Sequence, residues 1–261
     1  MTDPLRTFAA EREDQIASYA QNRAFQDHSQ DWVLEAMSER YVYNFDWMGR
    51  PIIQYPQDIV AMQEIVWATR PDVIIETGIA HGGSLALSAS LLALLDVADA
   101  AQNGSVFDPR RPKRKVIGVD IDIRAHNRAL IEAHPLANTM ELIEGSSTDA
   151  TTLDQVKTLI PDDARVMVCL DSNHTHDHVL AELNLYAPLV SPGLYCVVFD
   201  TFVEDAPAGF IKDRPWDKGN NPATAIQAWV PTAPDFEIDE AIHTKLMITG
   251  AKNGFLRRVP N

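Results

Sequence analysis

A strand-like run, a glycine-rich loop and a helix-like run follow one another between residues 73 and 95, and this succession constrains the fold most. Val73–Ile75 is apolar and β-branched, Glu76 ends it, and the loop 78–84 carries three glycines before the apolar stretch Leu85–Leu95. Glycines let a backbone approach a ligand closely, and free N–H groups at a helix start point toward it. The spacing is neither Gly-x-Gly-x-x-Gly nor Gly-x4-Gly-Lys-Ser/Thr, so neither the dinucleotide fingerprint nor a phosphate-binding P-loop is predicted. A plain strand-to-helix turn is the structural alternative.

A second buried strand also ends in a carboxylate. Val116–Val119 is short and apolar, and Asp120 follows it. Ligands of open α/β sheets bind beyond the carboxyl ends of the strands, where an acid after the second strand can accept both hydroxyls of a ribose. Asp120 could instead cap the helix predicted near Ile123. Asp122 is also placed for that cap, which leaves Asp120 free for the ribose.

Strand and helix patterns alternate from residue 71 onward. The predicted strands are Val73–Ile75, Val116–Val119, Met140–Ile143, Val166–Leu170 and Leu194–Val198. The predicted helices between them are Leu85–Ala98, Arg124–Ala133, Thr152–Leu159 and His176–Leu189. This alternation predicts a parallel sheet that is covered by helices on both faces.

The end of the chain breaks the alternation. Lys245–Thr249 and Phe255–Val259 flank the turn signal Asn253-Gly254, which predicts an antiparallel hairpin. Five parallel strands closed by such a hairpin form the Rossmann-like sheet of class I methyltransferases, rather than the six-stranded parallel sheet of dehydrogenases. The predicted fold class is therefore α/β, with this sheet at its centre.

The first 55 residues differ from the alternating part. Residues 1–40 are polar with helical periodicity, and they predict a helical arm. Residues 41–55 are rich in aromatic side chains and irregular, with a turn-like Gly49-Arg50-Pro51, and such a segment either covers a pocket or packs the arm onto the core. Residues 56–69 predict a helix. We therefore divide the chain into an arm with its cover segment (1–55) and a main domain (56–261).

The charge of the chain limits its partners. The 261 residues include 22 Lys and Arg against 37 Asp and Glu, which gives a formal net charge of −15. Because neutralised phosphates supply most nucleic-acid affinity, neither nucleic acid nor an anionic membrane is an expected partner. The basic residues between 110 and 115 are the exception, and we interpret them as a solvated loop before the second strand.

The cysteines and the lack of targeting signals bear on the compartment. Cys169 and Cys196 both fall inside strand patterns, which predicts buried, reduced thiols as in a cytosolic protein. No secretory signal, lipidation signal or uninterrupted apolar run of membrane length is visible. We expect a soluble cytoplasmic protein that forms a homo-oligomer.

Polar residues follow directly after the fourth predicted strand. Asp171 and His174 are three positions apart across a turn, so both can face the same cleft. A histidine can remove a proton from a hydroxyl, especially one acidified by a metal. The structural alternative is that this segment caps the next helix, with His176 and His178 on its solvated first turn. His174 and His178 have a zinc-like spacing, but no third ligand is suggested nearby.

The fifth predicted strand ends at Phe199-Asp200, with Glu204 shortly after it. Asp200 is the counterpart of Asp171 one strand along, so the two carboxylates could share Mg²⁺ or a similar oxygen-loving cation. Such a metal would lower the pKa of a coordinated alcohol, and His174 would then act as the general base. The polar segment Phe210–Pro222 is long for a compact domain, which indicates either a substrate lid or disorder.

Four runs carry a resemblance to a known family. They are Asp-Trp-x-Gly-Arg-Pro-Ile-Ile-Gln (46–54), Ile-Glu-Thr-Gly-Ile-Ala-His-Gly-Gly-Ser (75–84), Leu-Asp-Ser-Asn-His-Thr-His-Asp-His-Val (170–179) and Leu-Tyr-Ala-Pro-Leu-Val-Ser-Pro-Gly (185–193). Together they resemble the cephalosporin hydroxylase / rhamnosyl O-methyltransferase family over residues 40 to 260. The resemblance implies a class I S-adenosylmethionine fold and mainly O-methyl transfer.

The resemblance also implies residue roles. The methionine part of S-adenosylmethionine would be held after the first strand, and the ribose by Asp120. Ser146 would lie near the adenine, and Asp171 would serve the cofactor as well as the metal. The residues expected around the methionine part are Glu76, Gly78, Ala80, His81, Gly82 and Ser84.

One position departs from the family pattern. Relatives tend to carry a Glu-Asp pair after the fifth strand, whereas this chain has Phe199 before Asp200. Two carboxylates, Asp171 and Asp200, would remain for Mg²⁺, which could be weakly bound, could recruit Glu204 or could be absent.

The expected activity is transfer of a methyl group to a hydroxyl of a sugar or of a glycosylated or secondary metabolite. One alternative is a partner subunit that binds the cofactor without catalysis, and Phe199 keeps this possibility open. The other is a component of a cephalosporin-type hydroxylation system. A non-haem iron oxygenase needs two histidines and a carboxylate, but the usual His-x-Asp/Glu spacing is missing from the sequence.

Overall fold

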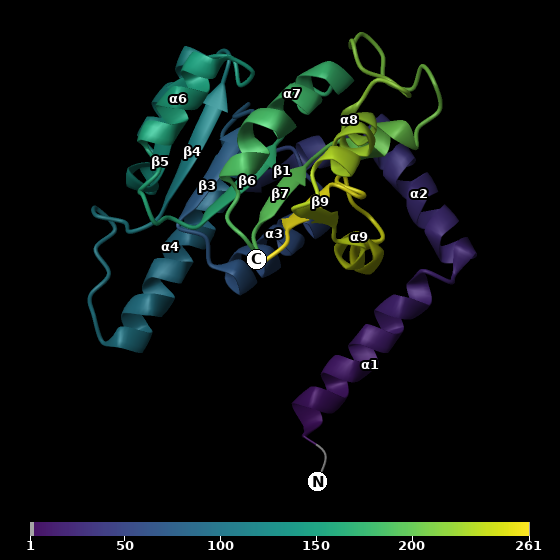
Figure 1. Cartoon of the computed structure of the whole chain (residues 1–261), viewed down its shortest axis with the longest axis horizontal. Helices are drawn as coiled ribbons and strands as arrows, with labels where there is room; N and C mark the ends of the chain where they lie inside the picture. Colours follow the sequence, from purple (N-terminus) through teal and green to yellow (C-terminus); the bar gives the residue numbers. More distant parts are fainter. Residues whose placement is uncertain (1–2, 261) are drawn as a thin grey trace.

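A seven-stranded sheet forms the centre of the computed structural model, which describes residues 3–260 (Figure 1). Its strand order is β5-β4-β3-β6-β7-β9-β8. The parallel strands are β3 (Val73–Thr77), β4 (Lys115–Asp120), β5 (Met140–Glu144), β6 (Val166–Leu170) and β7 (Tyr195–Val198), and the antiparallel strands are β9 (Phe255–Arg258) and β8 (Phe236–Ile238). The predicted fold class is confirmed.

Helices cover both faces of this sheet, as predicted. The first pair, α3 (Pro56–Thr69) and α4 (Gly83–Asn103), packs together behind the sheet in Figure 1, and α7 (His176–Tyr186) and α8 (Pro222–Trp229) pack together in front of it. Three further helices follow β3 in the chain, namely α5 (Ala125–Glu132), α6 (Ala150–Thr158) and α9 (Glu240–Leu246). Short 3₁₀ turns lie at Tyr41–Asn44 (η1), Ala137–Thr139 (η2), Ala187–Leu189 (η3), Thr201–Glu204 (η4) and Val230–Thr232 (η5). The parallel strands β3, β6 and β7 are buried along their whole length because helices cover both of their faces, whereas the edge strand β5 buries only Ile143.

Helix α4 is 21 residues long and has a mean hydropathy of 1.6, so it is long and apolar enough to cross a membrane by length and composition alone. Of the 18-residue stretch of α4 that has this mean hydropathy, 61% is buried inside the protein. The apolar character of α4 is thus used largely for packing. Cys169 and Cys196 are both buried and free, as predicted.

The predicted C-terminal hairpin is wrong in one of its strands. Lys245–Thr249 was expected to pair with the last strand, but α9 ends inside that segment, and β8 is the partner of β9 instead. The side chain of Asp239 caps α9 by accepting a hydrogen bond from Ala241 N at 3.2 Å. Ile242 and Leu246 lie one helical turn apart and pack against the core, so helical spacing outweighs the β-propensity of the segment.

The predicted arm consists of two helices, α1 (Pro4–Tyr19) and α2 (Arg23–Ser38); residues 1 and 2 lie outside the described residues. Helix α1 projects away from the sheet and buries none of its residues (Figure 1). Helix α2 packs on the rim of the sheet, where Val33 joins a small core with Tyr55 and Phe202. The Tyr55 hydroxyl donates a hydrogen bond to Val33 O at 2.9 Å.

The segment after the arm is more regular than its sequence indicates. Two short strands, β1 (Phe45–Trp47) and β2 (Arg50–Ile52), form a hairpin. Both residues of its two-residue turn, Met48 (φ 47°) and Gly49 (φ 81°), have positive φ, as a type I′ turn requires. The hairpin packs on the first turn of α4 so closely that a Cβ on Gly83 would lie 2.1 Å from Pro51 O.

The basic run before β4 is only partly a solvated loop. Arg110, Arg111 and Lys113 are exposed, but Arg114 is 8% exposed. Its Nη1 atom lies 2.6 Å from Asp96 Oδ1 and 2.8 Å from Asp99 Oδ2, and its Nε donates to Pro71 O. Arg114 therefore links α4 to the loops that precede β3 and β4.

Candidate active site

A cavity of about 350 Å³ opens at the carboxyl ends of β3, β6 and β7. Its floor is formed by the loops that follow these strands, at the position where open α/β sheets bind ligands. Its walls come from α2, from η1 with the segment 51–55, and from the predicted lid, through Ile211, Arg214 and Trp216. The aromatic cover segment and the segment 210–222 therefore both line the cavity, while their roles as a cover and as a lid stay predictions.

The loop after β3 needs its glycines for geometric reasons. Gly78 has φ 89°, and a Cβ on it would lie 2.1 Å from Asp171 O, so no other residue fits between β3 and β6. Gly82 also has positive φ (83°) and directly precedes α4. Ala80 and His81, between them, line the cavity together with Ser84.

Glu76 lies at the end of β3 and is only 4% exposed. Burial raises the pKa of this carboxyl, while the hydrogen bond from Ser88 acts in the opposite direction. Ser88 donates to Oε1, but Oε2 has no hydrogen-bond partner among the described residues. A buried carboxylate with one unpaired oxygen is suited to a ligand that carries hydrogen-bond donors.

Asp120 follows β4, and its side chain accepts hydrogen bonds from the glycine loop. Ile79 N and Ala80 N donate to Oδ2 at 2.8 and 3.3 Å. The helix-cap alternative is wrong, because α5 begins after Arg124 and has no side-chain cap. Asp120 and Ser146 are not among the residues that line the 350 Å³ cavity. Ser146 Oγ lies 3.0 Å from Thr148 Oγ1.

An arginine of the cover segment supports the same loop from the other side. Arg50 is 7% exposed, and its guanidinium donates to His81 O and, at 3.0 Å, to Asn127 Oδ1. Asn127 Nδ2 in turn donates to Ala80 O at 2.9 Å. Arg50 was not predicted as a site residue, although it lies within the family-like run 46–54.

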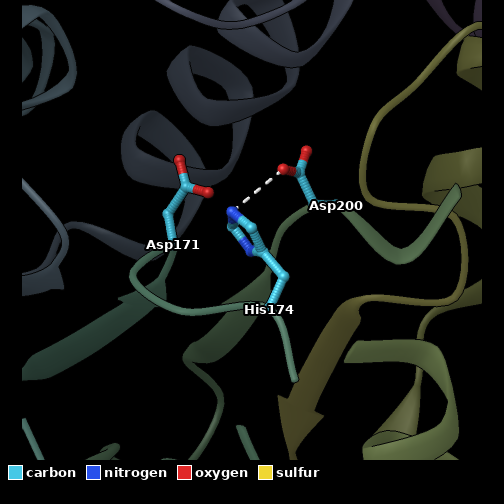
Figure 2. A group of neighbouring side chains, drawn as sticks. All are labelled: Asp171, His174 and Asp200. Carbon is cyan, nitrogen blue, oxygen red and sulfur yellow. Dashed lines mark ion pairs between the residues drawn. The ribbon is translucent and has the colours of Figure 1, made fainter. Parts of the chain in front are cut away.

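Asp171, His174 and Asp200 converge on one point at the rim of the cavity (Figure 2). One potential ligand atom from each residue lies within 4.8 Å of the other two. His174 Nε2 points between the carboxylates and lies 3.2 Å from Asp200 Oδ2. Adjacent parallel strands place the two acids on the same edge, as predicted, and the turn after β6 brings the histidine to them.

The carboxylates of this cluster repel one another. Burial, and then the nearby charge of Asp200, raises the pKa of Asp171 well above its usual range. A divalent cation would relieve this repulsion, because two carboxylates and an imidazole nitrogen are all metal ligands. The residues present therefore fit a divalent cation. His174 was predicted only as a general base. Its position beside both carboxylates also makes it a possible ligand of the same cation, which was not predicted.

Glu204, which was considered as a replacement ligand, does not join the cluster. Its Oε2 accepts hydrogen bonds from Gly219 N at 2.8 Å and from Asn221 Nδ2 at 2.6 Å. Glu204 therefore fixes the base of the lid. Phe199 is 5% exposed and faces the cavity, where it offers no ligand atom.

The other two histidines of the run have structural partners. His176 Nδ1 lies 2.9 Å from Thr224 Oγ1 and thus links α7 to α8. His178 Nε2 lies 3.1 Å from both Ser147 Oγ and Ser172 Oγ. His174 also contacts the lid, since Trp216 packs edge-on against its ring with the ring centroids 4.7 Å apart.

A third carboxylate, Asp58, lines the cavity and was not predicted from the sequence. It is 1% exposed and accepts hydrogen bonds from the Thr249 hydroxyl and from Gly250 N. Burial, with a smaller contribution from Asp200, raises its pKa to about 7 despite these hydrogen bonds. An acid in the first turn of α3, beside the apolar positions of that helix, was the signal that could have revealed it.

Asp58 should make stability depend on pH. Between about pH 4 and pH 7 the folded protein retains a proton that this carboxyl loses on unfolding, so the free energy of unfolding should fall as pH rises. Asp58→Asn should remove this dependence and become more stable than wild type at pH 8, by on the order of 1–4 kcal/mol. Urea unfolding of both proteins at pH 5 and pH 8 measures the difference. Equal pH dependence of the two proteins would contradict the assignment.

The arrangement of strands and site defines the class of protein. A parallel sheet that closes with an antiparallel pair, together with a glycine loop after the first strand, is the class I S-adenosylmethionine-dependent methyltransferase fold. The family model of rhamnosyl O-methyltransferase/CmcI matches residues 39–259. The chain therefore belongs to the rhamnosyl O-methyltransferase/CmcI family and is an S-adenosylmethionine-dependent O-methyltransferase.

Two curated relatives align with most of the chain. The rhamnosyl O-methyltransferase of Mycobacterium tuberculosis (strain ATCC 25618 / H37Rv) is 31% identical over 253 residues, which cover 93% of this chain and 91% of the relative. That of Mycobacterium leprae (strain TN) is 30% identical over 237 residues, which cover 87% and 91%.

Solved structures agree on the fold. "CmcI-N160 apo-structure" superposes with a TM-score of 0.56 at 20% identity and covers 84% of this chain and 78% of that one. "cmcI-D160 Mg-SAM" superposes with a TM-score of 0.54 at 19% identity and covers 83% and 77%.

Proposed function

We propose that the chain methylates a hydroxyl of a sugar, or of a glycosylated or other secondary metabolite. The observation that carries this proposal is the convergence of Asp171, His174 and Asp200 beside the glycine loop. The 350 Å³ cavity, with its aromatic wall and its lid, has room for a small-molecule acceptor. The similarity of the chain to rhamnosyl O-methyltransferases supports a sugar hydroxyl as the acceptor.

Methyl transfer needs alignment and a nucleophilic oxygen more than it needs covalent help. We propose that Asp171 and Asp200 hold Mg²⁺, which would acidify an acceptor hydroxyl that it binds. His174 Nε2, which lies 3.2 Å from Asp200 Oδ2 and points between the two carboxylates, would accept the proton from that hydroxyl. Phe199 leaves the metal with fewer acidic ligands, and Asp58 lies too far from the cluster to be grouped with it.

For the cofactor-binding residues we keep the assignments that the family resemblance implies. We propose that the methionine part binds at the loop after β3, that Asp120 accepts the ribose hydroxyls and that Ser146 lies near the adenine. The unpaired Glu76 Oε2 and the positive φ angles of Gly78 and Gly82, which turn the loop sharply after β3, support the first assignment. Asp120 already orders that loop, so ribose binding there would connect both halves of the cofactor. The methionine-part residues are Glu76, Gly78, Ala80, His81, Gly82 and Ser84.

We propose that the enzyme is cytoplasmic and that it forms a homo-oligomer. Free, buried cysteines support the first. The exposed Leu5 (79%) and Phe8 (60%) on α1 support self-association, because large apolar side chains are usually covered.

Turnover of methyl-labelled S-adenosylmethionine with a panel of glycosides tests this function. We expect label on a glycoside hydroxyl, loss of turnover in EDTA and recovery with added Mg²⁺. Full activity in EDTA would eliminate the metal. Binding of S-adenosylhomocysteine without turnover on any acceptor would favour the partner-subunit alternative.

A further inference from the structure

A second, much smaller cavity lies between the cover segment and β3. Its volume is about 10 Å³, which is the space of a single small group. Gln54 and Glu76 both line it, and Gly78, Ser84 and Phe199 line this cavity as well as the larger one. Gln54 also lines the larger cavity, so the two spaces meet at this side chain.

Buried acceptors without donors gather around the small cavity. Gln54 Oε1 and Glu76 Oε2 have no hydrogen-bond partner among the described residues, and neither does Thr77 Oγ1. Gln54 is 8% exposed and Glu76 is 4% exposed, so both side chains are largely shielded from bulk water. Buried polar atoms are normally paired, and two such acceptors beside one cavity indicate a ligand group that donates hydrogen bonds.

The charges around the small cavity indicate which kind of hydrogen-bond donor would bind there. Glu76 and Asp171 are acids, and no lysine, arginine or histidine is among the residues that line the cavity. An anionic group would be repelled there, while a cation would be favoured. A sulfonium carries positive charge but no N–H, so it would leave both acceptors unpaired. An ammonium group carries the charge and three donors, and it fits the volume.

We propose that Gln54 is a cofactor-binding residue whose Oε1, together with Glu76 Oε2, accepts hydrogen bonds from the α-ammonium group of the cofactor's methionine part. This inference rests on the proposed binding of S-adenosylmethionine at the loop after β3. It adds a residue outside the main domain predicted from the sequence, and it orients the amino acid end of the cofactor toward α3.

Two ligands that differ in the amino acid part separate this role from a structural one. S-adenosylhomocysteine retains the α-ammonium group but has no sulfonium charge. In contrast, 5′-methylthioadenosine carries only a methyl group on its sulfur and therefore lacks the amino acid part. Calorimetry with Gln54→Met, which keeps the side-chain length without the acceptor, should show roughly 10–100-fold weaker binding of S-adenosylhomocysteine. The affinity for 5′-methylthioadenosine should stay at the wild-type value, which also shows that the variant is folded.

Gln54→Glu completes the design because it keeps an acceptor at the same position and removes the amide donor. If the partner is the ammonium group, this variant should bind S-adenosylhomocysteine at least as well as wild type. Weaker binding than in Gln54→Met would point to the α-carboxylate instead and overturn the inference. Equal weakening of both ligands in Gln54→Met, or no weakening, would also overturn it. Failure of the wild-type protein to bind S-adenosylhomocysteine would instead refute the proposed cofactor site as a whole.

Discussion

Replacement of His174 by alanine is expected to lower kcat for methyl transfer by a factor of roughly 100 to 10,000, the usual contribution of a general base. The reason is geometric, since Nε2 lies 3.2 Å from Asp200 Oδ2 and within 4.8 Å of a carboxylate oxygen of Asp171. The affinity for S-adenosylhomocysteine should change little, because the proposed contacts of the cofactor come from other residues. Steady-state kinetics and calorimetry on the same preparation measure both quantities.

His176→Ala is the matched control, because that side chain bonds Thr224 and does not line the cavity. Its kcat should remain near the wild-type value. Rescue of His174→Ala by exogenous imidazole would support the role as a base. Rescue by a higher Mg²⁺ concentration would show that His174 is a metal ligand, and an unimpaired variant would eliminate both roles.

Replacement of Arg114 by methionine should cost about 3–5 kcal/mol of unfolding free energy, as is typical when one partner of a buried ion pair is removed. Asp96 has a side chain that is only 2% exposed, and Arg114 lies 2.6 Å from it. Without the guanidinium, this buried carboxylate would retain only the backbone hydrogen bond from Lys113 N. Chemical denaturation at neutral pH measures the loss.

Arg111→Met, three residues earlier in the same basic run, is the control. Arg111 is exposed, so its replacement should leave the free energy of unfolding almost unchanged. The double variant Arg114→Met/Asp96→Leu should recover much of the loss, because it leaves no unpaired charge at Asp96. An Arg114→Met protein as stable as wild type would show that the ion pair contributes nothing net.

The parallel half of the fold could be predicted because periodicity and burial agree there. Strands β3, β6 and β7 are buried along their whole length, so their sequences are largely apolar runs bounded by turns. The strand expected at Lys245–Thr249 fails because Asp239 starts a helix that the apolar content alone does not reveal. Arg114 could not be separated from the exposed arginines beside it, since its burial depends on Asp96 and Asp99 of a distant helix.

The site could be predicted where it follows the strand ends. Asp171 and Asp200 end adjacent parallel strands, and parallel ends share one edge. Gln54 and Asp58 were missed because they precede the first strand of the sheet and reach the site only through tertiary packing. The exclusion of Glu204 likewise depends on its bonds to the lid, which no local pattern encodes.

The contact of Arg50 with the glycine loop changes how the chain can be dissected. A fragment that starts at residue 56 would retain the whole seven-stranded sheet, yet it would lose the guanidinium that holds His81 O and orients Asn127. It would also lose the backbone that packs against Gly83. The smallest unit with an intact glycine loop therefore begins before the β1–β2 hairpin, and the boundary at residue 55 separates residues that support each other's structure.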